Sequence, residues 1–590
     1  MLRPRQRAIV LGCCLLMLVL MGLMIAFGLH ESRVLPQRRI TPLFDPAAAL
    51  EYTRTIAEQY PDRVTGTPAA GRAAEYLKAR FQKMGYRVSG DLFNMWLAGK
   101  RVEGQNVVAE LPGEVREAVA VIAHYDSQFT SHEAAEDNAS GVGTLLELAQ
   151  ALSHQPHHRE LIFAATDAEE WGMIGARDLR GFFRARQTLA VISIDYLTQG
   201  RPTLIAIDCE GQGAGYSPIW LRELIHQSGA LQGAMVQGPL PLQEWIERSV
   251  EVSAQDQGPL LRVGIPAINL STSSADQMGM RARYHTVQDV FANFQPATFQ
   301  MVGATVEQAL STLDKVQPAP PPEVKYLSLT GGRWLDRNSV EWLQTLALVP
   351  FMLACVLGVL NYEDDHLDRP LGTYLRPIVY LIPLLAMLVA LYALTHAGIL
   401  TRYEFYPATP KDPFLYRAPT HVVVPLLGVL LMGYIVVRIL RLFLPPAPQS
   451  FATAKRVFCV WMFLLVVWAL YLNPFAMWFF LGPLAYSFML LQRPAGWAAR
   501  AANACLLLLG ALPLVVLLYF FGREIYLGWR ILWYVVLQTA YGVWSTSAAA
   551  SFLLALALWV QLFRLGVFPP RNAARRVRLG LEPGLKLARE

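Results

Sequence analysis

Hydrophobic residues are distributed unevenly along the chain and divide it into three parts. Uncharged apolar runs occupy residues 8–29 and much of 342–567, whereas residues 30–336 mix charge, glycine and proline as a water-exposed domain does. The 22 residues from Ala8 to Leu29 are uncharged. That run is long enough to cross a hydrocarbon core of about 30 Å at about 1.5 Å per residue. The pattern therefore predicts one water-facing domain between two membrane parts.

The basic N-terminus predicts the orientation of the first part. Arg3, Arg5 and Arg7 precede the apolar run and favour a cytoplasmic position for the N-terminal tail. A cleaved signal peptide is the alternative, but the run exceeds a signal-peptide core and no Ala-x-Ala site follows before His30. We therefore interpret residues 1–29 as a tail and a retained anchor. The next domain then lies outside the cytoplasm, which for a bacterial inner membrane means the periplasm.

The C-terminal part, residues 338–567, is expected to be a multi-pass membrane domain. Its uncharged runs are 342–362, 377–400, 418–437, 457–492, 501–522 and 531–563. The run 457–492 would be about 54 Å long as one helix, which predicts two short spans hinged at Asn473-Pro474. The last run raises the same question around residues 545–551. We therefore expect seven or eight spans.

The segments that flank this membrane domain differ in composition. Residues 317–337 begin with a proline-rich stretch and are expected to be a linker. Residues 568–590 form a basic tail, which eight spans would place outside the cytoplasm and seven would place inside. The spans contain almost no ionisable residues, so we interpret them as an anchor or lipid-embedded platform rather than as a pump.

Composition agrees with a membrane protein and restricts its partners. Hydrophobic residues make up 54% of the chain and charged residues 16%, which is too apolar for a purely soluble protein. The formal net charge is only +6, and many cations lie beside apolar runs. No basic stripe is interleaved with aromatic residues, so we do not expect nucleic-acid binding. The expected partners are peptide substrates and the lipid bilayer, whereas the sequence indicates no particular protein partner.

Residues 30–316 show strands that alternate with helices. Short apolar strands are predicted in "AVAVIAHYDS" (118–127), "ELIFAATDAEE" (160–170) and "LAVISIDYL" (189–197), with a helix in "GVGTLLELAQAL" (141–152). This alternation predicts an α/β domain with a mostly parallel, doubly wound sheet. Functional residues of such sheets gather at the carboxyl ends of the strands.

Potential metal ligands follow each predicted strand. In chain order the candidates are His124 and Asp126 in "AHYD", Asp137 in "EDNASG", Glu169 and Glu170 in "DAEEWG", Asp195 in "SIDY" and His285 in "RYHTVQD". A hydrolytic metal centre needs anionic or imidazole ligands, a bridging carboxylate where there are two ions, and a free carboxylate that accepts a proton. The candidates include all of these groups. Taken singly, each is more often a cap or an ordinary loop residue.

The joint pattern resembles metallopeptidase family 28, the di-zinc aminopeptidases. That family carries His-x-Asp, Asp-Asn-x-Ser-Gly, Glu-Glu, a lone Asp after a strand and a late His, and the five motifs occur here in order within about residues 45–315. The stretches "RVTGTP" (63–68) and "GIPAINL" (264–270) are also similar. The resemblance implies a zinc-exopeptidase-like fold, peptide hydrolysis and two Zn2+ per chain.

The resemblance also implies which ion each ligand would bind. It places His124 and Asp195 on one zinc, Glu170 and His285 on the other, and Asp137 between them. Histidine and carboxylate ligands of this kind suit zinc, although cobalt or manganese would tolerate the same set.

Four further residues receive roles from the same resemblance. Glu169 would be the general base and acid, taking a proton from water and returning it to the leaving amine. Asp126 would accept the second ring N–H of the ligand two residues before it. Tyr284 and Asp256 are candidate substrate-binding residues. Gln257 stands where many members have histidine, so the shape of the substrate pocket is open.

These inferences lead to one leading hypothesis and two alternatives. The leading hypothesis is a membrane-bound, zinc-dependent aminopeptidase that hydrolyses the N-terminal residues of peptides on the extracytoplasmic side. A glutaminyl-peptide cyclotransferase is the first alternative, because related proteins of this fold use a similar metal shell with one zinc. A non-catalytic peptide-binding subunit of a membrane complex is the second, although this chain retains every ligand and the base.

Overall fold

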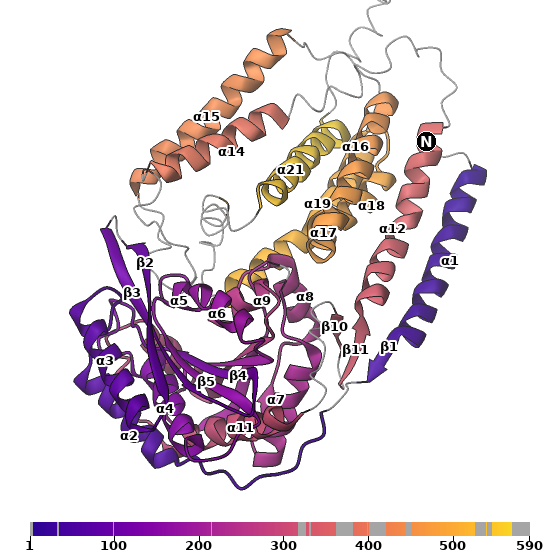
Figure 1. Cartoon of the computed structure of the whole chain (residues 1–590). Helices are drawn as coiled ribbons and strands as arrows, with labels where there is room; N and C mark the ends of the chain where they lie inside the picture. Colours follow the sequence, from indigo (N-terminus) through magenta and orange to yellow (C-terminus); the bar gives the residue numbers. More distant parts are fainter. Residues whose placement is uncertain are drawn as a thin grey trace, which may run out of the picture.

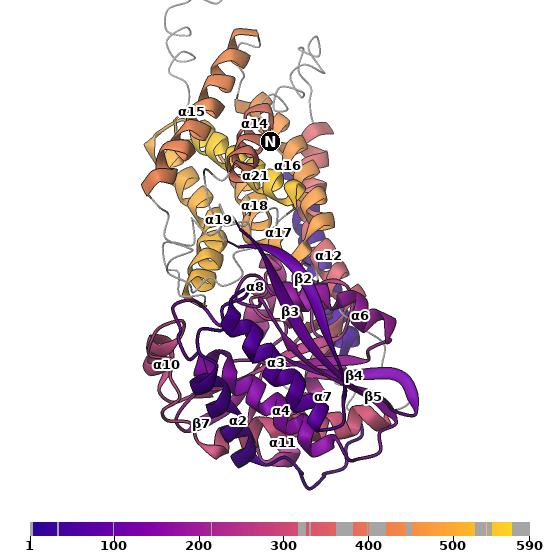
Figure 2. The same ribbon diagram turned by 60° about the vertical axis from the view of Figure 1, so that its left-hand side comes forward.

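The protein consists of an α/β domain and a bundle of apolar helices that lies on one side of it (Figures 1 and 2). The structure is a computed structural model. It describes residues 4–31, 35–97, 100–213, 215–316, 326–329, 332–360, 381–397, 399, 420–443, 451–524, 539 and 545–568. The fold class expected from the sequence, a mixed and mostly parallel sheet with flanking helices plus a helical membrane part, is confirmed.

An eight-stranded mixed sheet is the frame of the α/β domain. Its strands are β2 (Arg87–Leu97), β3 (Lys100–Leu111), β4 (Val115–His124), β5 (Arg159–Thr166), β6 (Ala190–Ile194), β7 (Pro202–Asp208), β8 (Val236–Gln237) and β9 (Ala267–Ser274). Their order across the sheet is β2-β3-β5-β4-β6-β9-β7-β8. The central run β5-β4-β6-β9 is parallel, as is the pair β7-β8, and the other neighbours are antiparallel.

Helices cover both faces of this sheet. One face is covered by α2 (Pro46–Gln59), α3 (Pro68–Lys83), α4 (Ser140–Leu152), α7 (Ile219–Gln232) and α11 (Pro296–Lys315). The other face is covered by α5 (Ile174–Asp178), α6 (Arg180–Ala185) and α9 (Gln257–Arg262). Helix α8 (Pro241–Val250) contacts α17 and β10, and α10 (Gln277–Arg283) contacts β9.

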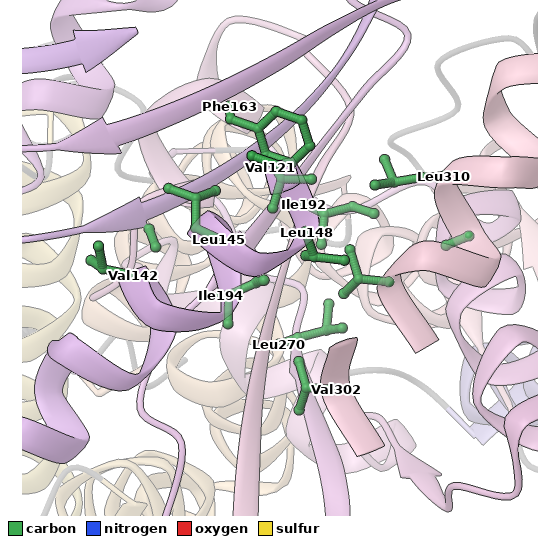
Figure 3. Packing of buried hydrophobic residues seen from close by; sticks show 14 of the residues in the cluster. Val121, Val142, Leu145, Leu148, Phe163, Ile192, Ile194, Leu270, Val302 and Leu310 are labelled. Atoms are coloured by element: carbon green, nitrogen blue, oxygen red, sulfur yellow. The ribbon is translucent and has the colours of Figure 1, made fainter. Parts of the chain in front are cut away.

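The alternation of side chains along β4 explains this two-sided packing. Val121 packs with Leu145 of α4 and Leu310 of α11 in the larger core (Figure 3). Its neighbours Ala120 and Ile122 face the smaller core beneath α6 and α9. Because successive side chains of a strand point to opposite faces, an uninterrupted apolar run is what a strand buried on both faces requires.

The sequence predicted the central elements but placed some of their ends too far along the chain; β6, for example, ends at Ile194 and not at residue 197. The three predicted strands and the helix are present as β4, β5, β6 and α4. However, β5 ends at Thr166, before the end that we predicted at residue 170. The carboxylate of Asp167 accepts hydrogen bonds from the main-chain N–H groups of Gln105 and Ala168, and Ala168 has a left-handed φ of 58°. The chain therefore turns before it reaches the Glu pair.

A small antiparallel sheet joins the α/β domain to the bundle. It consists of β1 (Leu29–Glu31), β11 (Arg333–Asp336) and β10 (Tyr326–Ser328). Helix α1 (Pro4–Gly28) runs into β1, β11 continues into α12 (Arg337–Leu360), and the two helices pack side by side (Figure 1). The segment expected to be a linker therefore contains two strands, and its residues 317–325 lie outside the described residues.

The described residues include six helices that are long and apolar enough to cross a membrane. These are Pro4–Gly28, Arg337–Leu357, Val423–Phe443, Ala454–Leu472, Trp497–Phe520 and Ser547–Val567, and two shorter apolar helices span Leu381–His396 and Pro474–Leu490. In the secondary structure the later helices are α14 (Leu381–His396), α15 (Thr420–Phe443), α16 (Phe451–Leu472), α17 (Pro474–Phe480), α18 (Gly482–Leu490), α19 (Trp497–Glu524) and α21 (Thr546–Val567). Parts of the expected runs 342–362, 377–400 and 531–563, and the tail after residue 568, lie outside the described residues.

The break in the long apolar run falls at Asn473, where the sequence predicted a hinge. Asn473 Oδ1 accepts a hydrogen bond from Ala476 N at 2.9 Å and so caps α17. Its Nδ2 donates to the carbonyl of Arg248 in α8 at 2.9 Å. Beside it, the indole N–H of Trp245 donates to the carbonyl of Phe475 at 3.2 Å. One residue therefore begins a helix of the bundle and attaches it to the α/β domain.

This double use of Asn473 gives a prediction with a matched control. Asn473→Ala removes the cap and the donor, and loss of an N-cap costs about 1 kcal/mol, or about a fivefold increase in local opening. Asn473→Asp keeps the cap acceptor and loses only the donor. Hydrogen–deuterium exchange of residues 474–480 in the full chain should therefore be fastest in the alanine variant and intermediate in the aspartate variant. Equal exchange in all three proteins would contradict the assignment.

Candidate metal centre

The predicted ligands come from five different segments and meet at one edge of the sheet. His124 is the last residue of β4, and Asp195 directly follows β6. Glu170 lies in the turn after β5, and Asp137 lies in the π-type turn η1 (Ala135–Ala139) that precedes α4. His285 follows α10. Since β5, β4 and β6 are parallel neighbours, their carboxyl ends bring these loops together.

Asp137 is shared by two groups of potential ligand atoms. His124 Nε2 lies 3.2 Å from Asp137 Oδ1 and 3.2 Å from Asp195 Oδ1. His285 Nε2 lies 3.0 Å from Asp137 Oδ2 and 3.2 Å from Glu170 Oε2. Within each group the potential ligand atoms are no more than 4.8 Å apart. The two groups coincide with the two ligand sets that the resemblance implied.

The burial of these groups tests whether the residues suit metal ions. None of the five exposes more than 9% of its surface. Both carboxylate oxygens of Glu170 are buried, and no described residue gives either a hydrogen bond of good geometry. A buried carboxylate without such partners is costly unless a cation completes its surroundings. Carboxylate oxygens and imidazole nitrogens at this spacing therefore suit two zinc ions.

Burial beside other charged groups shifts the pKa values of the carboxyl groups in this site. Burial raises the pKa of Glu169 well above that of an ordinary glutamate, an effect that the nearby His124 opposes and that Asp195 adds to. For Asp137, burial acts in the same direction, but hydrogen bonds from His124 and His285 outweigh it and hold the pKa below its usual value. The two carboxyl groups therefore differ, with Glu169 more ready to hold a proton.

Asp126 lies directly behind the first histidine. Its Oδ1 is 3.4 Å from His124 Nδ1. The same carboxylate accepts hydrogen bonds from the main-chain N–H groups of Glu169 at 3.1 Å and Glu170 at 3.3 Å. Asp126 thereby connects the His-x-Asp motif with the Glu-Glu motif. The sequence suggested only its contact with His124.

The two predicted substrate-binding residues have different surroundings. The Tyr284 ring stacks on the His285 ring with centroids 3.8 Å apart and meets Tyr196 edge-on at 5.4 Å. Asp256 is buried and accepts a hydrogen bond from the hydroxyl of Thr166, at the end of β5. Burial raises the pKa of Asp256 to about 7. The side-chain Nε2 of Gln257 donates hydrogen bonds to the carbonyl of Glu210 and to Oγ of Ser253. Both partners belong to the α/β domain.

Asp289 is a buried residue that the sequence interpretation missed. Its Oδ1 accepts from the main-chain N–H of Glu136 at 2.7 Å, and its Oδ2 accepts from that of Asp137 at 3.2 Å. It thus holds the turn that carries the shared ligand. The signal was available, because Asp289 is the last residue of "RYHTVQD", the motif that contains His285.

Arg63 is the second missed residue. Its guanidinium is fully buried and donates to the main-chain carbonyls of Ile56, Tyr60, Tyr125, Glu133 and Ala134. Burial lowers its pKa to about 10, which leaves the side chain charged at neutral pH. Arg63 therefore ties the loop before η1 to the end of β4. It opens the "RVTGTP" stretch, which we noted without assigning it a role.

Comparison with known proteins gives a family match for the part of the chain that contains these groups. Residues 106–310 match the family model "Peptidase family M28". The chain is 30% identical over 224 residues to the alkaline phosphatase isozyme conversion protein of Escherichia coli (strain K12), a match that covers 34% of this chain and 59% of that protein. The chain thus spans less than two thirds of that relative's length.

Solved structures of two kinds are similar to the α/β domain. A zinc aminopeptidase from Bacillus subtilis is 15% identical with a TM-score of 0.40, and the match covers 49% of this chain and 98% of that one. A glutaminyl cyclase from Porphyromonas gingivalis is 20% identical with a TM-score of 0.39, covering 46% and 99%.

The contacts of Asp289 predict an effect on metal binding. Asp289→Ala leaves the N–H groups of Glu136 and Asp137 without acceptors, and loss of such a supporting residue weakens metal affinity by about 10- to 100-fold. Asp289→Asn keeps one acceptor oxygen and should lose less. Zinc retention during titration with a competing chelator measures the effect, with the exposed Glu51→Gln as a control. Full zinc affinity in a folded Asp289→Ala protein would show that the turn needs no such support.

The contacts of Arg63 predict an effect on stability. Arg63→Met removes the donor to five main-chain carbonyls and should destabilise the α/β domain by about 3–5 kcal/mol, the cost typical of breaking a buried charged network. Arg54→Met removes an exposed ion pair with Glu51 and a cation–π contact with Phe291, and it should cost about 1 kcal/mol. Thermal unfolding of both variants in detergent compares them. If the unfolding temperature fell no further in Arg63→Met than in Arg54→Met, Arg63 would not stabilise these loops.

Proposed function

From the match of residues 106–310 to the peptidase family M28 model, we propose that the protein is a membrane-bound, zinc-dependent aminopeptidase. It removes N-terminal residues from peptides on the extracytoplasmic side of the membrane. The observation that carries this proposal is the pair of buried ligand groups that share Asp137, with the carboxyl group of Glu169 beside them.

Each residue of the site has a defined task in this proposal. The ligand groups hold two zinc ions, which when bound supply Lewis acidity toward a peptide carbonyl and make water more acidic. Glu169 belongs to neither ligand group, and its main-chain N–H is fixed by Asp126. Its raised pKa suits a carboxyl group that takes a proton from water and returns it to the leaving amine. Tyr284, whose ring stacks on that of His285, is the proposed substrate contact.

The ends of the apolar helices support the proposed orientation. Lys455, near the start of α16, donates to the carbonyls of Met489 and Leu491 at the end of α18. Asn503 of α19 donates to Gly566 near the end of α21. These contacts gather helix ends on the side of the bundle opposite the attachment at Asn473 (Figure 1). The cations on that side are Arg5, Arg7, Arg438, Arg441, Lys455, Arg493, Arg500 and Arg564.

A cytoplasmic position for this cationic side agrees with the positive-inside tendency. We take α17 and α18 together as one span, and α12, α14, α15, α16, α19 and α21 as one span each. Among the described residues this gives seven spans after the peptidase domain, which favours the seven-span version of the prediction, with the basic tail in the cytoplasm.

The proposal is tested by activity and metal content together. The purified full chain should contain about two zinc ions and release single amino acids from the N-terminus of peptides. Glu169→Gln should retain zinc and lower kcat by about 10²- to 10⁴-fold, the range typical of general acid–base residues. The exposed Glu75→Gln should leave both unchanged.

Other results would indicate the alternative functions. Ammonia released from peptides with N-terminal glutamine, without any free amino acid, would identify a cyclotransferase. Absence of bound zinc after dialysis against zinc-containing buffer would exclude the catalytic proposal. Removal of the metal with a chelator should abolish activity, and added zinc should restore it.

A further inference from the structure

An apolar cluster connects the turn that carries Glu169 and Glu170 to the membrane helices. Ala168 and Trp171, which flank the Glu pair, are buried in this cluster together with Phe93 of β2 and Phe479 of α17. We call it the bridging cluster. The proposed base, Glu169, and the candidate ligand Glu170 are therefore adjacent in sequence to residues of a cluster that includes a side chain of the bundle.

The bundle residues that pack against the bridging cluster lie near helix ends. Leu394 is two residues before the end of α14, Leu426 is six after the start of α15, and Phe520 is four before the end of α19. At about 1.5 Å per residue, each lies within about 10 Å of its helix end. That depth corresponds to the boundary between hydrocarbon and headgroups. On the orientation proposed above, the bridging cluster, which contains both neighbours of the Glu pair, therefore lies near the bilayer surface.

Two separate attachments keep the domain in this orientation. One joins α8 to α17 through Trp245 and Asn473. The other is Tyr326 of β10, whose hydroxyl lies in the domain core, donates to the carbonyl of Ser217 and contacts Arg222. Since β10 pairs with β11, which runs directly into α12, this second attachment also leads to the bundle. With two attachments, the domain cannot turn its site away from the membrane without breaking buried contacts.

An apolar side chain lies on the rim of the site beside the bridging cluster. The ring of Phe129 stacks on Trp171 with centroids 6.1 Å apart and is 50% exposed. The next residue, Thr130, donates its hydroxyl to the carbonyl of His285 at 2.8 Å. Phe129 thus belongs to the loop between Asp126 and the shared ligand, on the side where Trp171 enters the bridging cluster.

We propose that the active site opens toward the bilayer surface and that its substrates are polypeptides whose N-terminus emerges at that surface. Such chains are held there by a transmembrane or lipid anchor farther along. This inference rests on the proposed aminopeptidase function and adds the class of substrate. It also assigns a function to the bundle, which holds the site so close to the membrane that a chain of only a few residues can reach it.

The height of the site above the membrane can be measured with substrates of different reach. Full-length protein is reconstituted into liposomes with model substrates that have one transmembrane helix and 6 or 20 residues before it. Six extended residues reach about 20 Å at about 3.3 Å each. A site on the far side of a domain about 40–50 Å across requires at least 12–15 residues. Both substrates share the vesicle, so enrichment in the membrane affects them equally.

The expected result is that the 6-residue substrate is trimmed at no less than one third of the rate of the 20-residue substrate. A lower ratio overturns the inference, because it shows that the site lies out of reach of short chains. A free peptide with the same N-terminal sequence, assayed beside Glu169→Gln, separates the two proposals. If the free peptide is trimmed and the short anchored one is not, only this inference fails. If wild-type protein trims none of the substrates, the proposed function fails as well.

Discussion

The burial of like charges at the ends of parallel strands is the constraint on which this structure depends. Asp137, Glu169, Glu170 and Asp195 are all buried in one cluster, and two histidines cannot balance four carboxylates. Such a cluster is costly in a protein interior unless cations complete it. Binding of metal to such ligands would therefore contribute to the stability of the fold as well as to chemistry. Much of the surrounding structure holds these groups in place despite their mutual repulsion.

The supporting residues act mainly through main-chain groups. Asp126 and Asp289 accept hydrogen bonds from the N–H groups of the turns that carry the ligands, and Arg63 donates to the carbonyls of the preceding loops. This arrangement fixes loops that would otherwise be irregular and mobile. The bridging cluster and the cap at Asn473 extend the same network to the bundle. On the proposed orientation, the membrane helices thus set the height of the site above the bilayer.

A large part of the fold and of the candidate site could be predicted before the structure was known. The central strands were recognisable because a strand buried on both faces needs an uninterrupted apolar run. Three candidate ligands, His124, Glu170 and Asp195, were recognisable because each lies at or just after such a strand, whereas Asp137 and His285 were recognisable from their short motifs. The end of β5 was wrong because Asp167 draws the chain into a turn through Gln105, a residue in another strand. The hairpin β2–β3 and the sheet of β1, β10 and β11 were not predicted.

Local composition and order along the chain account for the apolar runs, the break at Asn473 and the types of ligand, because each depends on neighbouring residues. The tertiary structure decided which groups share Asp137, how Arg63 and Asp289 hold the loops, and how the α/β domain is attached to the bundle. These features depend on contacts between distant segments, such as Asp289 with Glu136 across 153 positions and Asn473 with Arg248 across 225. No local pattern carries that information, since such contacts exist only once the sheet and the bundle have formed.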